Sequence, residues 1–247
     1  YWYSVARDAV DLESAQEIGR KTGLRSAARL GARKIATCEV PVIFEAPIAS
    51  SLIGHFASAI SGGSLYRKSS FLLDSIGEQV FAPDIQILDL PYLPKGLGSG
   101  PFDEDGVATM ERKIVENGIV QGYFLGSSSA RKLKMDTTGN SGGAHNLIIQ
   151  SANTLDVPAL LKKLHTGLLV TELLGHGVNG VTGDYSRGAS GFWVENGRIA
   201  YPVEEITIAG NLKDIYRGIL AIGNDVIVRG SKQSGSILID RMTVAGE

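Results

Sequence analysis

Cysteine is almost absent from this chain of 247 residues, which has only Cys38. A single cysteine cannot form an intrachain disulfide, and such scarcity is typical of proteins kept in a reducing compartment. The sequence also lacks any apolar run near the roughly 20 residues that a membrane span requires. These absences predict a cytoplasmic protein that makes no membrane contact.

Neither sign of charge dominates, because 24 Lys and Arg residues face 26 Asp and Glu residues, for a formal net charge of −2. This balance provides no electrostatic basis for a nucleic-acid partner, so we expect none. The chain opens on Tyr1, Trp2 and Tyr3, without an initiator methionine or a signal-peptide pattern. We expect that part of the native protein precedes Tyr1.

Glycine is abundant, with 31 residues, which favours tight turns and β-structure over a helical bundle. Asn117-Gly118 and Asn196-Gly197 each lie between strand-like flanks and predict two hairpins with type I′ turns. The repeated Val-Glu-Asn-Gly also permits an internal duplication. No linker divides residues 1–247, so we expect one α+β unit, mainly antiparallel β-sheet with several packed helices.

Residues 47–60 predict a buried helix. Four apolar side chains spaced by four residues form one stripe, Pro47 suits the first turn and Gly62 suits the exit. His55 lies at the edge of this stripe, where its hydrogen bonding must be satisfied. We interpret His55 as a core histidine with one hydrogen-bond partner.

Other patterns predict the surrounding elements. The expected helices cover residues 14–30, 156–164 and 211–222, each beginning at a capping residue, and the expected strands cover 40–44, 85–88, 144–150, 167–174, 205–209, 226–229, 236–239 and 242–245. Pro41 places the strand over 40–44 at a sheet edge or at a strand start.

Residues 139–143 fit the pattern Gly-x-Ser-x-Gly, and the order His55, Asp103, Ser141 matches that of trypsin-like proteases. A nucleophile elbow needs a strong strand before the serine and a helix after it, and neither is indicated here. We interpret the segment as a glycine-rich turn. The acidic residues 103–105 predict a solvated loop, with a hard cation as the alternative.

The remaining histidines, His145, His165 and His176, do not share the spacing of metal ligands. His165 follows an expected helix, where a cation suits the dipole, and His176 lies between two glycines. The glycine-rich residues 96–101 match neither a P-loop nor a dinucleotide fingerprint. We expect no cofactor to bind this chain.

Four segments carry a resemblance to a known family. Residues 181–197, 201–212 and 221–225 closely resemble the TldD/TldE metallopeptidase family, and residues 61–74 resemble its TldE (PmbA) branch. The resemblance covers nearly the whole chain and implies the body and C-terminal region of such a protein. It also implies a native N-terminal domain that this chain does not contain.

The resemblance gives the helix over 47–60 a specific interpretation. TldD-type subunits carry His-Glu-x-x-x-His in this helix, with a cysteine near the C-terminus as a third zinc ligand. Aligned on the shared Gly-His, the first histidine, the glutamate and the second histidine fall on Ser50, Ser51 and His55, and the resemblance places the cysteine on Ser234, between Gln233 and Gly235. Serine hydroxyls are poor zinc ligands, and Ser51 cannot act as a base near neutral pH. We therefore expect no catalytic residue and no metal in this chain, with His55 as the weak remaining candidate ligand.

The resemblance implies a zinc-less subunit of a cytoplasmic metalloprotease. Such a subunit pairs with a TldD-like catalytic chain, which holds the zinc, and acts in the proteolysis and maturation of unfolded or modified peptides. Two alternatives remain open: a peptide-binding homodimer without catalysis, and a peptidase active on its own through His55 or Ser141.

Overall fold

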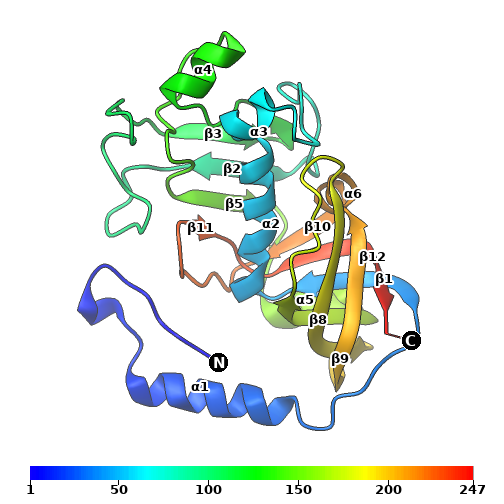
Figure 1. The fold of residues 1–247 in the computed structure, drawn as a ribbon. Coiled ribbons are helices and arrows are strands. Elements are labelled where there is room, and N and C mark those ends of the chain that lie inside the picture. The colour runs from blue at the N-terminus through cyan, green and yellow to red at the C-terminus, as the bar shows by residue number, and fades with distance from the viewer. Residues whose placement is uncertain (247) are drawn as a thin grey trace.

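Two β-sheets share one core with a helix that runs along both of them (Figure 1). The computed structural model describes residues 1–246. The larger sheet has the strand order β1-β7-β8-β9-β12-β10-β6, and the smaller has the order β11-β5-β2-β3-β4. Most pairings are antiparallel, which confirms the expected α+β class.

Within residues 1–246, twelve strands form the two sheets, and six α-helices pack around them. The larger sheet contains β1 (Cys38–Phe44), β6 (Thr154–Leu155), β7 (Gly167–Leu174), β8 (Asp184–Glu195), β9 (Arg198–Asn211), β10 (Ile219–Gly223) and β12 (Ile237–Ala245). The smaller contains β2 (Ile85–Asp89), β3 (Arg112–Glu116), β4 (Ile119–Val120), β5 (Leu147–Ser151) and β11 (Lys232–Gln233). The helices are α1 (Ala15–Ala28), α2 (Ala46–Ala59), α3 (Gly62–Tyr66), α4 (Ser127–Leu133), α5 (Val157–Leu164) and α6 (Leu212–Arg217), with a 3₁₀ turn over Ala9–Asp11.

Strand β1 closes the larger sheet into a ring. It pairs in parallel with β7 on one side and antiparallel with β12 on the other, and β8 and β9 complete the circuit. The expectation that Pro41 marks an edge strand or a strand start is therefore wrong. The register with β12 shifts between Val40 and Val42, and this irregularity accommodates a residue that cannot donate a backbone hydrogen bond.

Helix α2 confirms the expected buried helix. Leu52, Phe56 and Ile60 are buried in the shared core, and Pro47 lies in the first turn. The expected exit at Gly62 is wrong, because α2 ends at Ala59 and Gly62 begins α3, which Ser61 caps by accepting from the backbone N–H of Ser64. The short connection sends the chain directly from α2 towards the smaller sheet.

Both Asn-Gly hairpins are confirmed. The φ angles are +51° and +77° at Asn117 and Gly118, and +51° and +71° at Asn196 and Gly197, as type I′ turns require. The second hairpin is longer than expected, because β9 runs without interruption from Arg198 to Asn211. Strand β8 thereby reaches far enough to lie over α2.

Three expected elements at the C-terminal end are corrected. The helix that Asn211 caps ends at Arg217, and Gly218 introduces strand β10 instead of a longer helix. Residues 226–229 form no strand. The two strands expected at 236–239 and 242–245 are one strand, β12, which bends to pair with β10 in its first half and with β9 in its second.

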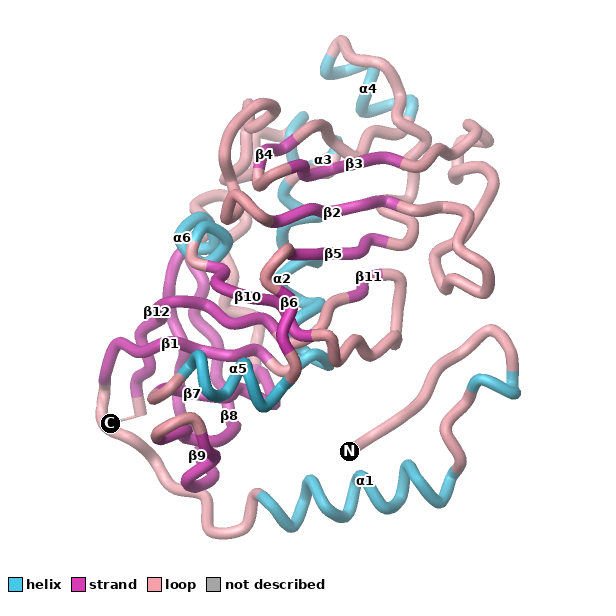
Figure 2. Tube along the Cα trace, turned by 180° about the vertical axis from the view of Figure 1, so that it is seen from behind, coloured by secondary structure: helices cyan, strands magenta, loops and turns pink. Residues whose placement is uncertain are grey.

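Helix α1 lies at the end of the molecule away from the smaller sheet, in both views of the chain (Figures 1 and 2). Its expected cap is confirmed, since the Ser14 side chain accepts from the backbone N–H of Glu17. None of its residues is buried. Two ion pairs hold it to the body, Arg25–Glu45 and Arg29–Glu172.

Candidate functional site

One face of α2 lines two neighbouring cavities. Ser51, His55 and Ser58 follow the spacing i, i+4, i+7, which puts them on the same side of a helix. Ser51 lines a cavity of about 640 Å³, whereas His55 and Ser58 line a second cavity of about 270 Å³. Arg187 of β8 lines both.

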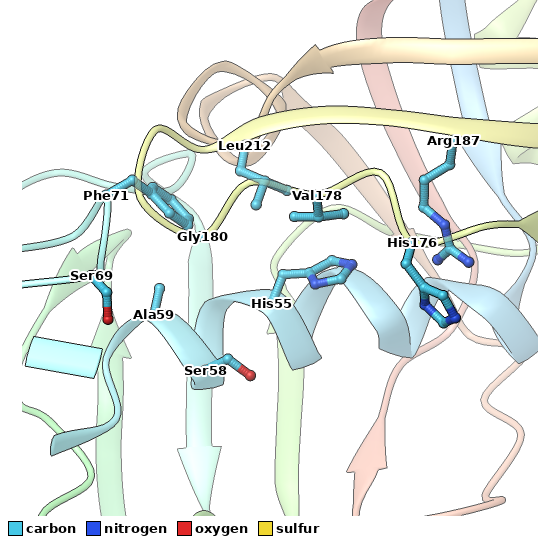
Figure 3. Close-up of a pocket in the computed structure, with 10 residues that line it drawn as sticks. All are labelled: His55, Ser58, Ala59, Ser69, Phe71, His176, Val178, Gly180, Arg187 and Leu212. Carbon is cyan, nitrogen blue, oxygen red and sulfur yellow. The ribbon is translucent and has the colours of Figure 1, made fainter. Parts of the chain in front are cut away.

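The smaller cavity gathers basic side chains (Figure 3). The imidazoles of His55 and His176 and the guanidinium of Arg187 point to the same end of it, and Phe71 and Val178 close the apolar part of the wall. No Asp or Glu lines this cavity among the described residues. Its charge therefore favours an anion over a cation.

His55 has no hydrogen-bond partner for its buried Nε2 atom within residues 1–246. The expectation of one satisfied bond is thus wrong, and the ring instead packs edge to face on Tyr185, with 6.1 Å between centroids. Burial, and secondarily the charge of Arg187, lower the pKa of His55 below its ordinary 6.5. The neutral imidazole is the favoured form at neutral pH.

Tyr185 and Arg187 belong to the same face of β8, because side chains alternate along a strand. The Tyr185 hydroxyl and the Arg187 Nε are buried without a partner in the described part of the chain. Burial raises the pKa of Tyr185 to about 12, although the Arg187 cation opposes the shift. Three unpaired polar atoms, one each on His55, Tyr185 and Arg187, are thus concentrated beside the cavity.

The structure places the four family positions around α2. Ser50, Ser51 and His55 lie on α2 itself, and Ser234 lies between β11 and β12 in a segment that runs beside it. Ser236 of this segment accepts a 3.0 Å hydrogen bond from the backbone N–H at the start of α2. The chain therefore retains the scaffold on which the family pattern would assemble.

Two of the three serine hydroxyls at these positions donate to backbone carbonyls. Ser51 Oγ donates to the Ile48 carbonyl at 2.7 Å, and the buried Ser234 Oγ donates to the Gly235 carbonyl at 2.6 Å. Helix α2 continues unbroken through Gly54, so positions 50 and 55 lie about 140° apart around its axis. Two side chains so placed do not converge on one ion.

A zinc ion does not fit this donor set. Structural and catalytic zinc sites use thiolates, imidazoles and carboxylates, and only His55 among the four positions supplies such a group. Its Nε2 is buried and Arg187 adds a repelling charge. Within residues 1–246, no three His, Cys, Asp or Glu side chains are grouped so that they could share a metal.

Ser141 lies away from His55, in a third cavity of about 340 Å³. Asp103 does reach Ser141, but its carboxylate accepts the backbone N–H of Ser141 and those of Asp105 and Val107. The acidic residues thus shape the expected loop. Residues 139–143 form a turn between α4 and β5, as their interpretation as a glycine-rich turn predicts.

His145 belongs to a separate buried network. The fully buried Asp89 accepts hydrogen bonds from the His145 backbone N–H at 2.8 Å and from Asn140 Nδ2 at 2.9 Å, and lies 3.2 Å from His145 Nδ1. Arg112 donates to Asn140 Oδ1 at 3.0 Å. His165 is exposed and follows α5 as expected. Of the three further histidines, His176 alone lines the cavity of His55.

The comparisons with known proteins decide the family. The sequence profile described as PmbA/TldA metallopeptidase C-terminal domain matches residues 37–246. The chain belongs to the PmbA/TldD/TldE family. The expected resemblance is confirmed.

Two bacterial relatives and two solved structures give the extent of the similarity. The chain is 51% identical over 246 residues to the metalloprotease PmbA homolog of Haemophilus influenzae and 49% identical over 247 residues to the metalloprotease PmbA of Escherichia coli O157:H7. Both matches cover 100% of this chain, and they cover 54% and 55% of those proteins. The chain therefore spans about half the length of these relatives.

A crystal structure from Thermotoga maritima is 37% identical, with a TM-score of 0.91 over 99% of this chain and 58% of that one. TldE from Thermococcus kodakarensis has a TM-score of 0.85 at 22% identity, over 98% of this chain and 57% of that one, which is a likeness of fold. The fold described above is therefore shared with experimental structures.

Sequence reasoning missed the residues that surround His55. In the sequence, Tyr185 and Arg187 stand out only as members of the family-like segment 181–197, and His176 lies between two glycines that predict a turn. The alternation Tyr185, Arg187 in β8 was a usable signal, since it predicts one shared face. What it cannot predict is that this face lies over α2.

Proposed function

We propose that this chain is the C-terminal part of a zinc-less, TldE-like subunit of a cytoplasmic heteromeric metalloprotease. It would pair with a TldD-like catalytic chain that holds the zinc and help to enclose the space where unfolded or modified peptides are cut and matured. The observation that carries the proposal is the donor set, in which Ser50, Ser51 and Ser234 replace the family's ligands and base.

The local chemistry supports a subunit without its own catalytic centre. Ser51 and Ser234 use their hydroxyl protons on neighbouring carbonyls, and His55 is the single imidazole among the four positions. Ser141 and His55 line different cavities, which gives no support to a serine peptidase. No helix within residues 1–246 has both the length and the apolar character of a membrane span.

The decisive experiment uses the full-length protein, alone and mixed with its TldD-like partner. We expect no stoichiometric zinc in the protein alone, no chelator-sensitive peptide cleavage by it, and a stable complex that cleaves when the partner is added. Stoichiometric zinc or chelator-sensitive cleavage by this protein alone would contradict the proposal. Failure to form a complex would favour the peptide-binding homodimer.

A further inference from the structure

Arg187 lacks a carboxylate partner although it lies among charged groups. The larger cavity holds two glutamates, Glu45 and Glu172, and each is already paired with an arginine, the first in α1 and the second at the C-cap of α1. No ion pair to Arg187 exists within residues 1–246. Half-buried guanidinium groups are usually paired, because desolvation without a partner is costly.

Arg187 lies at the junction of the two cavities. Among residues 1–246 it is the one residue that lines both the larger and the smaller cavity, so it lies above α2 between Ser51 and His55. These two residues occupy the family positions of the glutamate and the second histidine. A fixed positive charge therefore lies over the helix face on which the family pattern would place its metal chemistry.

We infer that Arg187 binds a carboxylate group of an extended peptide that lies along α2 through both cavities. A guanidinium presents paired N–H donors that match the two oxygens of a carboxylate. The two imidazoles of the smaller cavity carry no negative charge that would repel a carboxylate. The apolar walls suit peptide side chains. That the ligand is a peptide rests on the proposed function, whereas the preference for a carboxylate follows from the unpaired guanidinium of Arg187.

Shape and chemistry fit this occupant along the whole path. The larger cavity is lined by apolar side chains such as Ile48, Leu169 and Phe192, and the smaller by Phe71 and Val178. Arg229, the other arginine of the larger cavity without an ion pair in residues 1–246, stacks on the rings of Trp2 and Tyr3 and does not line the smaller cavity. Arg187 is therefore the cation that faces the ligand at the junction of the two cavities.

The test measures binding of three unlabelled, N-acetylated pentapeptides of alanine and leucine to the full-length protein by isothermal titration calorimetry. One peptide has a free carboxyl terminus, one has a carboxyl-terminal amide, and one has the amide plus an internal glutamate. We expect at least one carboxylate peptide to bind about tenfold or more tightly than the neutral amide. Preference for the free acid alone identifies the chain terminus, and preference for the glutamate peptide identifies an acidic side chain.

Matched variants connect this preference to Arg187. Arg187→Gln should remove the preference and Arg187→Lys should retain part of it, whereas Arg198→Gln, an exposed arginine on the same hairpin, should change nothing. Equal binding of all three peptides by the unmodified protein, or a preference that survives Arg187→Gln, would overturn the inference.

A second pair of variants covers the case in which Arg187 variants do not fold. Ser51→Glu introduces a carboxylate into the cavity that Arg187 lines, so it should compete for the guanidinium and abolish the preference, and Ser51→Gln should not. Equal effects of the two would count against the inference. None of these measurements needs the TldD-like partner or zinc, so the outcome is separate from that of the proposed function.

Discussion

The rings of His55 and Tyr185 meet edge to face with 6.1 Å between their centroids, and each holds a buried polar atom without a hydrogen-bond partner in residues 1–246. An unpaired buried hydroxyl costs about 1–3 kcal/mol relative to its solvated state. At this point the contact between α2 and β8 therefore depends on packing and not on hydrogen bonding.

This contact predicts opposite behaviour for two buried tyrosines. Tyr185→Phe removes an unpaired hydroxyl and should leave the free energy of unfolding unchanged or raise it by up to about 1 kcal/mol. Tyr216→Phe removes the 2.9 Å bond to the Leu52 carbonyl and should lower it by about 1 kcal/mol. Urea unfolding of both variants measures the difference, and an equal loss in the two would contradict the assignment.

The lowered pKa of His55 predicts a pH-dependent stability. Below about pH 6.5, His55 takes up a proton in the unfolded chain more readily than in the folded chain. The stability that the neutral imidazole contributes is therefore fully present above that pH and is lost as the pH falls towards the pKa of the folded state. His55→Gln removes the titrating group. The stability of the native protein minus that of this variant should therefore decrease from pH 7.5 to pH 5 in urea titrations.

The control for this effect is Ser58→Ala, which alters an exposed side chain on the same face of α2 and removes no titrating group. The difference between the native protein and this variant should stay nearly constant over the same range. A difference for His55→Gln that grows on acidification would mean that the folded state stabilises the imidazolium.

Metal removal should have no effect on the protein alone. Because the donor set at Ser50, Ser51, His55 and Ser234 does not fit zinc, incubation with EDTA should not change the thermal unfolding midpoint. Calorimetry of the full-length protein, before and after dialysis against EDTA, checks this. A lower midpoint that added zinc restores would show a site that the aligned positions do not account for.

The Asp89 network predicts a large loss from one substitution. Asp89→Ala leaves the His145 and Asn140 donors unpaired in a buried site and should cost about 3–5 kcal/mol of unfolding free energy. Asp84→Ala removes a carboxylate that accepts from Ser151 and Asn153 nearer the surface, and should cost about 1 kcal/mol. Guanidinium unfolding separates the two values, and similar losses would contradict the buried network.

Close packing of β7 against β8 predicts contrasting effects for two glycines of β8. A Cβ at Gly191 would lie 1.9 Å from the Leu169 carbonyl oxygen, so Gly191→Ala should destabilise the ring by about 3 kcal/mol. A Cβ at Gly188 would lie 3.2 Å from the Leu174 Cβ, and Gly188→Ala should cost less than about 1 kcal/mol. Thermal unfolding of the two variants compares them directly.

The elements that sequence predicted best are those specified by local chemistry. Helix α2 follows from its apolar stripe and Pro47, and the hairpins follow from Asn-Gly pairs whose φ angles few other residues adopt. The sequence pattern does not predict strand β10, because its apolar residues continue the helix-like composition of α6 beyond Gly218, where the helix ends. Pro41 misled because a local register shift admits it into an interior strand.

The candidate site was predictable only in part, because local sequence patterns determine which residues share one helix or strand but not how these elements pack together. His55, Ser50 and Ser51 share one helix, so their relation can be derived from helical periodicity. Arg187 and His176 reach His55 through tertiary packing of β8 and the preceding loop over α2, and no periodicity encodes that packing. The absence of a hydrogen-bond partner for His55 is likewise a property of the assembled interior.

The double pairing of β1 has a consequence for how the chain is made. Its two neighbours, β7 and β12, come from the middle and the extreme end of the sequence, and residues 237–245 must emerge before the ring can close. A nascent chain that lacks this last strand exposes one edge of β1 and the apolar residues beneath it. The ring of strands therefore stays open in any nascent chain that ends before residue 237, and the wall that β7 and β8 form beside α2 is fixed in place only after β12 has been added.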